Sequence, residues 1–337
     1  MTLQLYVSRL PAPFTAMRST PFHRIRSMRE FSLLRSIYAK NHTLSADVLI
    51  PPGDDMALLR LPESSGSLLA AVDQVIAGRH FTLGVTPINL IGRKAVARSA
   101  SDIAAMAAVP LASLASVILP LDFPEADARS LFEAVRITAS SLRCPLIGGD
   151  MAIASAPLSL SITVLALPGP RTPIRRDSAQ PGDLIYVTGS LGGAWRDQRA
   201  GRHLTFNPRI DEALALSQQF PVTAMIDLSD GLGRDLDHIA ESSGLSATLD
   251  ASAIPCAPGC SWRAALSDGE DYELCFTAPP HCSLPAEIMG IPITRIGSLE
   301  KPSQPAQRRT LIITPDGERL DASDMGWEHR GSHASTP

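Results

Sequence analysis

The residues best suited to chemistry lie in the stretch 222–240. Apolar residues at 222–226 predict a buried strand, Asp227 and Asp230 follow at its end, and apolar residues then recur at helical spacing. Gly231 permits a tight bend between the two elements. Carboxylates between a strand end and a helix start are oriented for a task other than packing. The alternative is that Ser229 or Asp230 only caps the next helix.

Further acids recur at turns and strand ends along the chain. The full set is Asp55, Asp73, Asp102, Asp150, Asp227, Asp230, Glu270 and Asp271. If these side chains converge, they cannot all stay ionised without cations, and Mg²⁺ shared with substrate phosphates is the common biological solution. The pattern therefore predicts phosphoryl transfer, in which the protein positions two polyanions and screens their charge. The other interpretation is a set of solvated acids at turns.

No standard nucleotide-binding loop accompanies these acids. The glycine-rich turn at 189–194 follows a predicted strand and leads into a predicted helix, where its N–H groups would suit a phosphate. Its spacing fits neither the dinucleotide fingerprint nor the Walker A loop. Lys94 lies in the middle of a predicted helix, and Arg234-Asp235-Leu236 lacks the asparagine of a kinase catalytic loop. We therefore expect metal ions to carry the electrostatic role that lysine has elsewhere.

The composition is that of a globular protein with room for two domains. Of 337 residues, 45% are hydrophobic and 19% are charged. The net charge of -4 and the lack of a basic run argue against nucleic acid as a partner. No apolar run approaches the roughly 18 residues of a membrane span, so we expect no membrane partner.

Five thinly spread cysteines make no disulfide framework, so we expect a reducing compartment, the cytoplasm. Cys256 and Cys260 flank a Pro-Gly turn, with His281 and Cys282 downstream. A zinc site is the alternative for these four residues, although structural zinc sites usually show two compact ligand pairs.

Residues 1–27 differ from the rest of the chain, because they are rich in arginine, serine and threonine and contain no acid. This composition is typical of an organelle transit peptide. The interpretation we favour is a disordered or mis-assigned extension, with translation starting at Met28.

Strand and helix patterns alternate from Met28 onward and predict a mixed α/β protein with a boundary in the Pro-, Gly- and Arg-rich segment 168–181. Asp102 lies in a helix predicted over 86–108, where a buried acid would be costly; we expect it to face a cavity, a cation or solvent. The predicted helices are 31–38, 86–108, 125–142, 208–219 and 232–240, and the main predicted strands are 56–61, 68–72, 111–119, 145–147, 158–167, 183–188, 222–226, 248–251, 272–277, 293–296 and 311–313.

Seven motifs in this order resemble the thiamine-monophosphate kinase family of the AIR-synthetase-like (PurM-like) superfamily. The resemblance runs from about Met28 to Trp327, and the 270–274 block with His80-Phe81 favours this branch over its relatives. The motifs are Gly53-Asp54-Asp55, Asp73 to Phe81, Ser101 to Met106, Gly148-Gly149-Asp150, Asp183 to Gly189, Ile226 to Leu232 and Gly269 to Leu274.

The resemblance implies ATP-dependent phosphorylation of thiamine monophosphate to thiamine diphosphate, by direct in-line transfer with several Mg²⁺ ions. It implies an N-terminal domain over 28–167, a C-terminal domain over 168–330, a tail at 331–337, and a homodimer whose N-terminal sheets pair. It makes Asp102 and Asp150 central to the reaction. Carried over by position, the metal ligands are Asp55, Asp73, Asp102, Asp150, Asp227 and Asp230; the ATP contacts are Gly149, Asp150, Arg176 and Ser229; the thiamine phosphate contacts are His80, Glu270 and Trp327.

The chain departs from the family pattern at several positions. The hydroxyl residues usual before the first metal aspartate are Ala71 and Val72, which have no side-chain oxygen to offer a metal. Met151 replaces a usual threonine, Ser99 or Ala100 a usual asparagine, and Asp268 a usual glycine. We expect an active enzyme with altered metal geometry, because every acid is retained. The alternatives are a non-catalytic nucleotide-binding or regulatory protein, or a sister kinase or ligase with another substrate.

Overall fold

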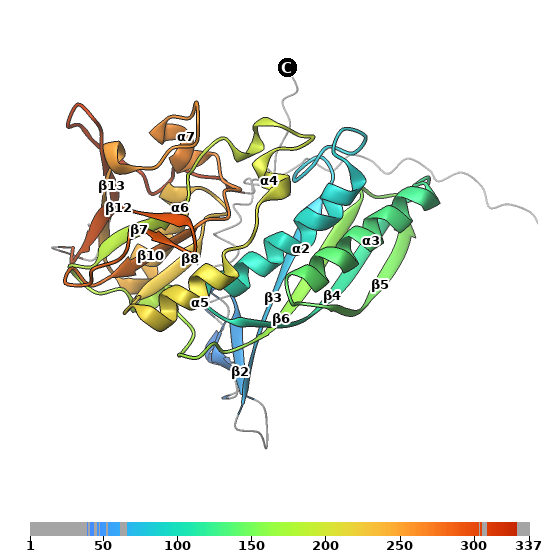
Figure 1. Cartoon of the computed structure of the whole chain (residues 1–337), viewed down its shortest axis with the longest axis horizontal. Coiled ribbons are helices and arrows are strands. Elements are labelled where there is room, and N and C mark those ends of the chain that lie inside the picture. The colour runs from blue at the N-terminus through green and yellow to red at the C-terminus, as the bar shows by residue number, and fades with distance from the viewer. Residues whose placement is uncertain are drawn as a thin grey trace, which may run out of the picture.

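A computed structural model describes residues 39–60 and 66–328, except positions 40, 44, 45, 47, 52, 303 and 305–308. Our expectations for the extension 1–27, the helix 31–38 and the tail 331–337 lie outside the described residues. Two mixed sheets lie side by side, each with helices packed against it (Figure 1). The predicted two-part α/β architecture is confirmed.

The first sheet has six strands in the order β1-β2-β3-β6-β4-β5. β4 and β5 run parallel, and α3 (Glu125–Ser141) makes the crossover between them that a parallel pair requires. The other neighbouring pairs are antiparallel. The strands are β1 (Val48–Ile50), β2 (Ala57–Arg60), β3 (Ser67–Ile76), β4 (Val109–Pro120), β5 (Leu146–Ala154) and β6 (Ser159–Leu167).

The second sheet follows the order β14-β13-β9-β12-β7-β10-β8, with β11 paired to β12. Two helices pack against this sheet in separate hydrophobic cores. α5 (Ile210–Gln219) contributes to one core and α6 (Leu232–Ser243) to the other. The other α-helices among the described residues are α4 (Arg202–Thr205) and α7 (Trp262–Ser267). The strands are β7 (Leu184–Thr188), β8 (Ala224–Asp227), β9 (Ser246–Asp250), β10 (Leu274–Ala278), β11 (Glu287–Ile288), β12 (Ile291–Glu300), β13 (Thr310–Ile313) and β14 (Arg319–Asp321).

α2 (Ile88–Ala105) contributes to the cores of both halves. Ile91 and Ile103 are buried against the first sheet, whereas Ala100 and Ala104 are buried with residues of α5 and the second sheet. A helix that is apolar on several sides is expected when both flanks are covered. Gly92 lets α2 approach α3 closely, because a Cβ there would lie 2.7 Å from a backbone carbonyl oxygen of α3. α2 therefore holds a fixed position between the two sheets (Figure 1).

One face of the first sheet is covered by α2 and α3 (Figure 1), and within the described residues the apolar side chains of the opposite face are exposed; we call it the open face. Val72 on β3 and Leu114 on β4 both register with Thr163 of the intervening β6, so the three side chains form a row on the open face. Val72 is 62% exposed and Leu114 38% exposed. An apolar sheet face left uncovered in one chain is typical of an interface.

The glycine-rich turn at 189–194 does not lead into a regular helix, so that prediction is wrong. Gly189, Gly192 and Gly193 all have left-handed φ angles, which interrupt helical geometry. A single 3₁₀ turn (Ala194–Arg196) and the four-residue α4 follow. No helix in the described part of the chain has both the length and the apolar character needed to cross a bilayer.

Candidate active site

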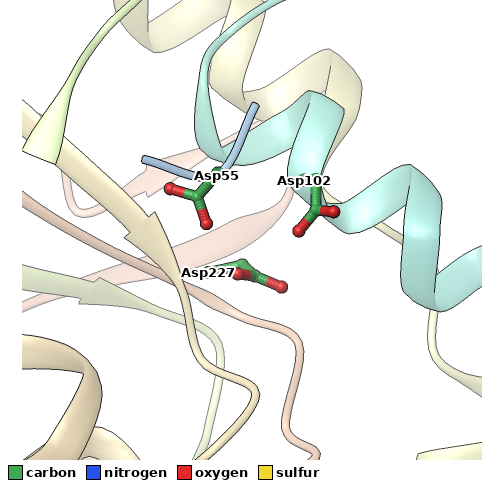
Figure 2. A group of neighbouring side chains, drawn as sticks. All are labelled: Asp55, Asp102 and Asp227. Atoms are coloured by element: carbon green, nitrogen blue, oxygen red, sulfur yellow. The ribbon is translucent and has the colours of Figure 1, made fainter. Parts of the chain in front are cut away.

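Three aspartates from distant parts of the chain meet between the two sheets. Asp55 follows the turn before β2, Asp102 projects from α2, and Asp227 is the last residue of β8 (Figure 2). One carboxylate oxygen from each aspartate lies within 4.8 Å of one from each of the other two. The local structure explains the convergence, because β8 directs its end toward the helix that both halves share.

Burial and mutual repulsion shift the acidity of this cluster. Burial, reinforced by the charge of Asp55, raises the pKa of Asp227 to about 7. Burial also raises the pKa of Asp102 well above its ordinary value, with Asp73 as the next contributor. Three carboxylates this close resist ionisation together unless a cation joins them.

Arg176 supplies part of the compensating charge. Its Nε donates to Asp55 at 2.8 Å and its Nη2 donates to the other oxygen at 2.5 Å. The neighbouring Asp54 accepts from the Arg176 backbone N–H at 3.2 Å. Asp54 and Asp55 thus both engage Arg176, although only Asp55 belongs to the cluster.

The cluster suits a hard divalent cation. All its donors are carboxylate oxygens, and oxygens that share one Mg²⁺ at about 2.1 Å lie at most about 4 Å apart. Three oxygens of the cluster, one from each carboxylate, lie within 4.8 Å of one another, so small side-chain movements would bring them to this separation. Cys256, Cys260, His281 and Cys282, the alternative zinc ligands, do not form such a group in the described residues.

The other predicted metal ligands lie in different surroundings. Asp73 on β3 accepts a hydrogen bond from Arg98 Nε at 3.1 Å. Asp230 lines a neighbouring cavity. Asp150 is exposed on the edge strand β5 and registers with Ser116, three strands from Asp73. Three strand spacings are about 14 Å, and the strand alternation directs Asp150 to the open face, so it does not join the cluster within one chain.

A cavity of about 660 Å³ is lined by residues that neighbour the cluster in the chain: Ser229 and Asp230 follow Asp227, and Arg98 lies one turn before Asp102 on α2. It brings together all three predicted thiamine phosphate contacts, His80, Glu270 and Trp327, with Ser229 and Asp230. Trp327 is held there by its backbone N–H, which donates to the carbonyl of Asp230 at 2.8 Å. The remaining lining residues, none of which was among the predicted substrate contacts, are Gly78, Arg79, Phe81, Thr82, Arg98, Gly193, Trp195, Arg196, Gln198 and Asp268.

Lys94 is a further residue that sequence reasoning missed. Its fully buried ammonium group donates to the carboxylate of Glu270 and to the carbonyl of His80 at 2.6 Å, and lies 3.0 Å from His203 Nδ1. It also lies 4.4 Å from the centre of the Trp195 ring. Burial lowers the pKa of Lys94 to about 8, and the charge of Glu270 limits the fall. The only sequence signal was a lysine amid apolar helix residues.

Glu270 is ionised in this setting. Burial opposes its charge, but hydrogen bonds from His203 and Lys94 outweigh burial and lower its pKa. Its backbone has a left-handed φ of 55°, and its N–H donates to the carbonyl of Ser229 at 2.7 Å. The loop that carries Glu270 is therefore fixed to the turn that follows β8.

Asp235, not Ser229 or Asp230, satisfies the turn before α6. Its carboxylate accepts from the N–H groups of Asp230 and Gly231 at 3.0 and 3.1 Å. The residue at the helix cap is Gly231, which makes no side-chain capping bond. Ser229 and Asp230 lie before the capping position, and both residues line the cavity.

Comparison with known proteins identifies the family. The model of AIR synthase related protein, N-terminal domain, matches residues 53–167, and that of the C-terminal domain matches residues 180–281. The thiamine-monophosphate kinase of Escherichia coli K12 is 33% identical and covers 89% of this chain and 98% of its own. That of Rhodopirellula baltica is 34% identical over 75% of this chain and 84% of its own.

Solved structures of thiamine-monophosphate kinases are also similar to this chain. AaThiL complexed with AMPPCP and TMP is similar with a TM-score of 0.73 and 25% identity, covering 89% of this chain and 97% of its own. The thiamine-monophosphate kinase of Stenotrophomonas maltophilia K279a is 32% identical with a TM-score of 0.63, covering 87% and 98%. The chain belongs to the thiamine-monophosphate kinase family.

Proposed function

We propose that the protein transfers the terminal phosphoryl group of ATP directly to the phosphate of thiamine monophosphate, giving thiamine diphosphate. The observation that carries this proposal is the junction of two sites: an aspartate cluster suited to metal-bound phosphates and a cavity with an ionised glutamate and two tryptophans. Ser229 and Asp230 lie between them, after Asp227 and in the cavity wall.

Asp55, Asp102 and Asp227 would hold Mg²⁺ at this junction, with Asp230 as a further ligand. When bound, Mg²⁺ neutralises the phosphate oxygens of both substrates. The chain's own part is to orient the two phosphates in line. α2 and the end of β8 fix Asp102 and Asp227 for that purpose, and Arg176 adds a second source of positive charge beside Asp55.

The cavity would bind the organic part of thiamine monophosphate. The ring system of thiamine is cationic, which suits the ionised Glu270 and the faces of Trp195 and Trp327. His80 Nδ1 accepts from the backbone N–H of Ile76 at 3.0 Å, which makes Nε2 the protonated nitrogen of the neutral ring. This bond fixes the orientation of His80 in the cavity wall.

ATP would contact Arg176 and Ser229, together with Gly149 and Asp150. We propose a homodimer formed through the open face of the first sheet, in the cytoplasm. Gly149 and Asp150 lie on the edge strand of that sheet, so their contact to ATP belongs at the dimer interface and not beside Asp102. The all-reduced cysteines are compatible with the cytoplasm.

The test is an assay of purified protein with ATP, Mg²⁺ and thiamine monophosphate. We expect thiamine diphosphate and ADP in equal amounts, with turnover lost in Asp102→Asn. The second candidate, a nucleotide-binding protein without turnover, is favoured by the absence of side-chain oxygens at Ala71 and Val72. Binding of ATP with no product in the wild-type protein would establish it.

A further inference from the structure

Arg98 and Asp73 form an ion pair near Asp102 of the aspartate cluster. Arg98 Nε lies 3.1 Å from Asp73 Oδ2, and the two side chains are 16% and 27% exposed. Burial acts against the arginine cation, yet attraction by Asp73 and then by Tyr272 and Glu270 raises its pKa well above the ordinary value. Arg98 is therefore a permanent cation beside the aspartate cluster.

The position of Arg98 is set by a rigid element. It lies four residues before Asp102 on the 18-residue α2, so the two side chains occupy the same side of the helix, one turn apart. Arg98 also lines the cavity that contains Ser229, Asp230 and Glu270. Arg176, in contrast, comes from a 3₁₀ turn at Arg176–Ser178 in the connection between the sheets.

Asp73 has little to offer a metal ion. It does not belong to the group of carboxylates within 4.8 Å of one another. The preceding side chains, Ala71 and Val72, contain no oxygen, and Val72 faces the opposite side of the sheet. A guanidinium already neutralises its charge.

We propose that Arg98 is a built-in cation that replaces a divalent ion at Asp73 and contacts the phosphates during transfer. This inference rests on the proposed function. A guanidinium presents several N–H donors in one plane, a geometry that matches phosphate oxygens. Arg98 then provides from the protein the positive charge that a metal at Asp73 would otherwise supply. Asp73 is a positioning residue, since it orients Arg98.

The experiment counts Mn²⁺ ions bound to the full chain in the presence of AMPPCP and thiamine monophosphate, by electron paramagnetic resonance of the free ion. We expect Asp73→Asn to bind the same number of ions as the wild-type protein, and Asp102→Asn to bind at least one fewer. A loss of one ion in Asp73→Asn would overturn the inference. An unchanged count in Asp102→Asn would instead reject the proposed metal centre itself.

A second variant keeps the test decisive if Asp73→Asn does not fold. Arg98→Met should retain the wild-type number of Mn²⁺ ions or more, while kcat falls about 100-fold, the usual effect of removing one charge-stabilising donor. Arg98→Lys should recover part of the rate. The matched control is Arg60→Met, at an exposed arginine that ends β2, which should keep the wild-type kcat. A wild-type kcat in Arg98→Met would overturn the inference.

Discussion

Lys94 donates from its buried ammonium group to the carboxylate of Glu270, in the wall of the substrate cavity. The two residues are 176 positions apart and belong to different halves of the molecule. Lys94 also contacts the carbonyl of His80 and the ring of Trp195. One side chain therefore organises three residues of the proposed thiamine phosphate site.

Lys94→Met should weaken both the fold and the binding of thiamine monophosphate. Removing one partner of a buried ion pair costs about 3–5 kcal/mol, because the other charge is left uncompensated. We expect a loss of this size in the free energy of unfolding by urea titration, and a KM for thiamine monophosphate raised about tenfold. Lys94→Met/Glu270→Gln should recover part of the stability, since no lone charge remains. Additive losses in the double variant would contradict this.

The effect of Mg²⁺ on thermal stability should depend on pH. The pKa of Asp227 is 3.8 unfolded and about 7 folded, so the folded state retains a proton that the unfolded state loses between those values. Protonated Asp227 therefore contributes to the stability of the folded state. This contribution is complete below about pH 4 and is lost as the pH rises through 7. Mg²⁺ binds the ionised form, and at pH 6 it must first displace a proton.

We therefore expect Mg²⁺ to raise Tm more at pH 8 than at pH 6, measured by differential scanning fluorimetry. Asp227→Asn, which cannot titrate at this position, should reduce the difference between the two pH values. An equal Mg²⁺ effect at both pH values in the wild-type protein would show that Asp227 does not hold the ion.

His80→Ala should raise the KM for thiamine monophosphate more than the KM for ATP. His80 lines the cavity but does not belong to the aspartate cluster, so its loss removes a contact to one substrate only. An increase of about tenfold is the expected size for one hydrogen bond to a charged partner. The matched control is His281→Ala, at an exposed histidine outside the cavity lining. Equal changes in both KM values would reject this placement of His80.

Leu114→Asp should dissociate the proposed dimer. The introduced carboxylate would have to lose its water when two such faces meet. Substitution of a residue at the centre of an interface raises the dissociation constant by about 30-fold or more. Ile137→Asp is the matched control, because Ile137 is also an exposed apolar residue but lies on α3, on the covered side of the sheet. Analytical ultracentrifugation distinguishes the species. A dimer unaffected by Leu114→Asp would place the interface elsewhere.

Much of the fold could be predicted from local patterns. The helix predicted over 86–108 is α2 (Ile88–Ala105), and that predicted over 125–142 is α3 (Glu125–Ser141). In α3 the helical period is visible, because Leu131, Val135 and Thr138 are buried at intervals of four and three residues. The prediction that the turn at 189–194 leads into a helix was wrong, because the sequence does not reveal that three of its glycines adopt left-handed φ angles.

The site was predictable by residue type but not by arrangement. Acids at a turn and a strand end indicated Asp55 and Asp227, and an acid within an apolar helix indicated Asp102; these three do converge. Nothing in the sequence shows that Lys94 reaches Glu270, because the contact depends on how the halves of the molecule pack. Asp150 illustrates the converse: its motif resembles the family's, yet strand order places it on the edge of the sheet, away from the cluster.

α2 is packed into the cores of both halves, and this limits how the enzyme can admit its substrates. A hinge between the halves would have to pull Ala100 and Ala104 out of one core or Ile91 and Ile103 out of the other. We therefore expect substrates to enter past the partly exposed Trp195 and Trp327, with Arg98 and Asp102 held in place by α2.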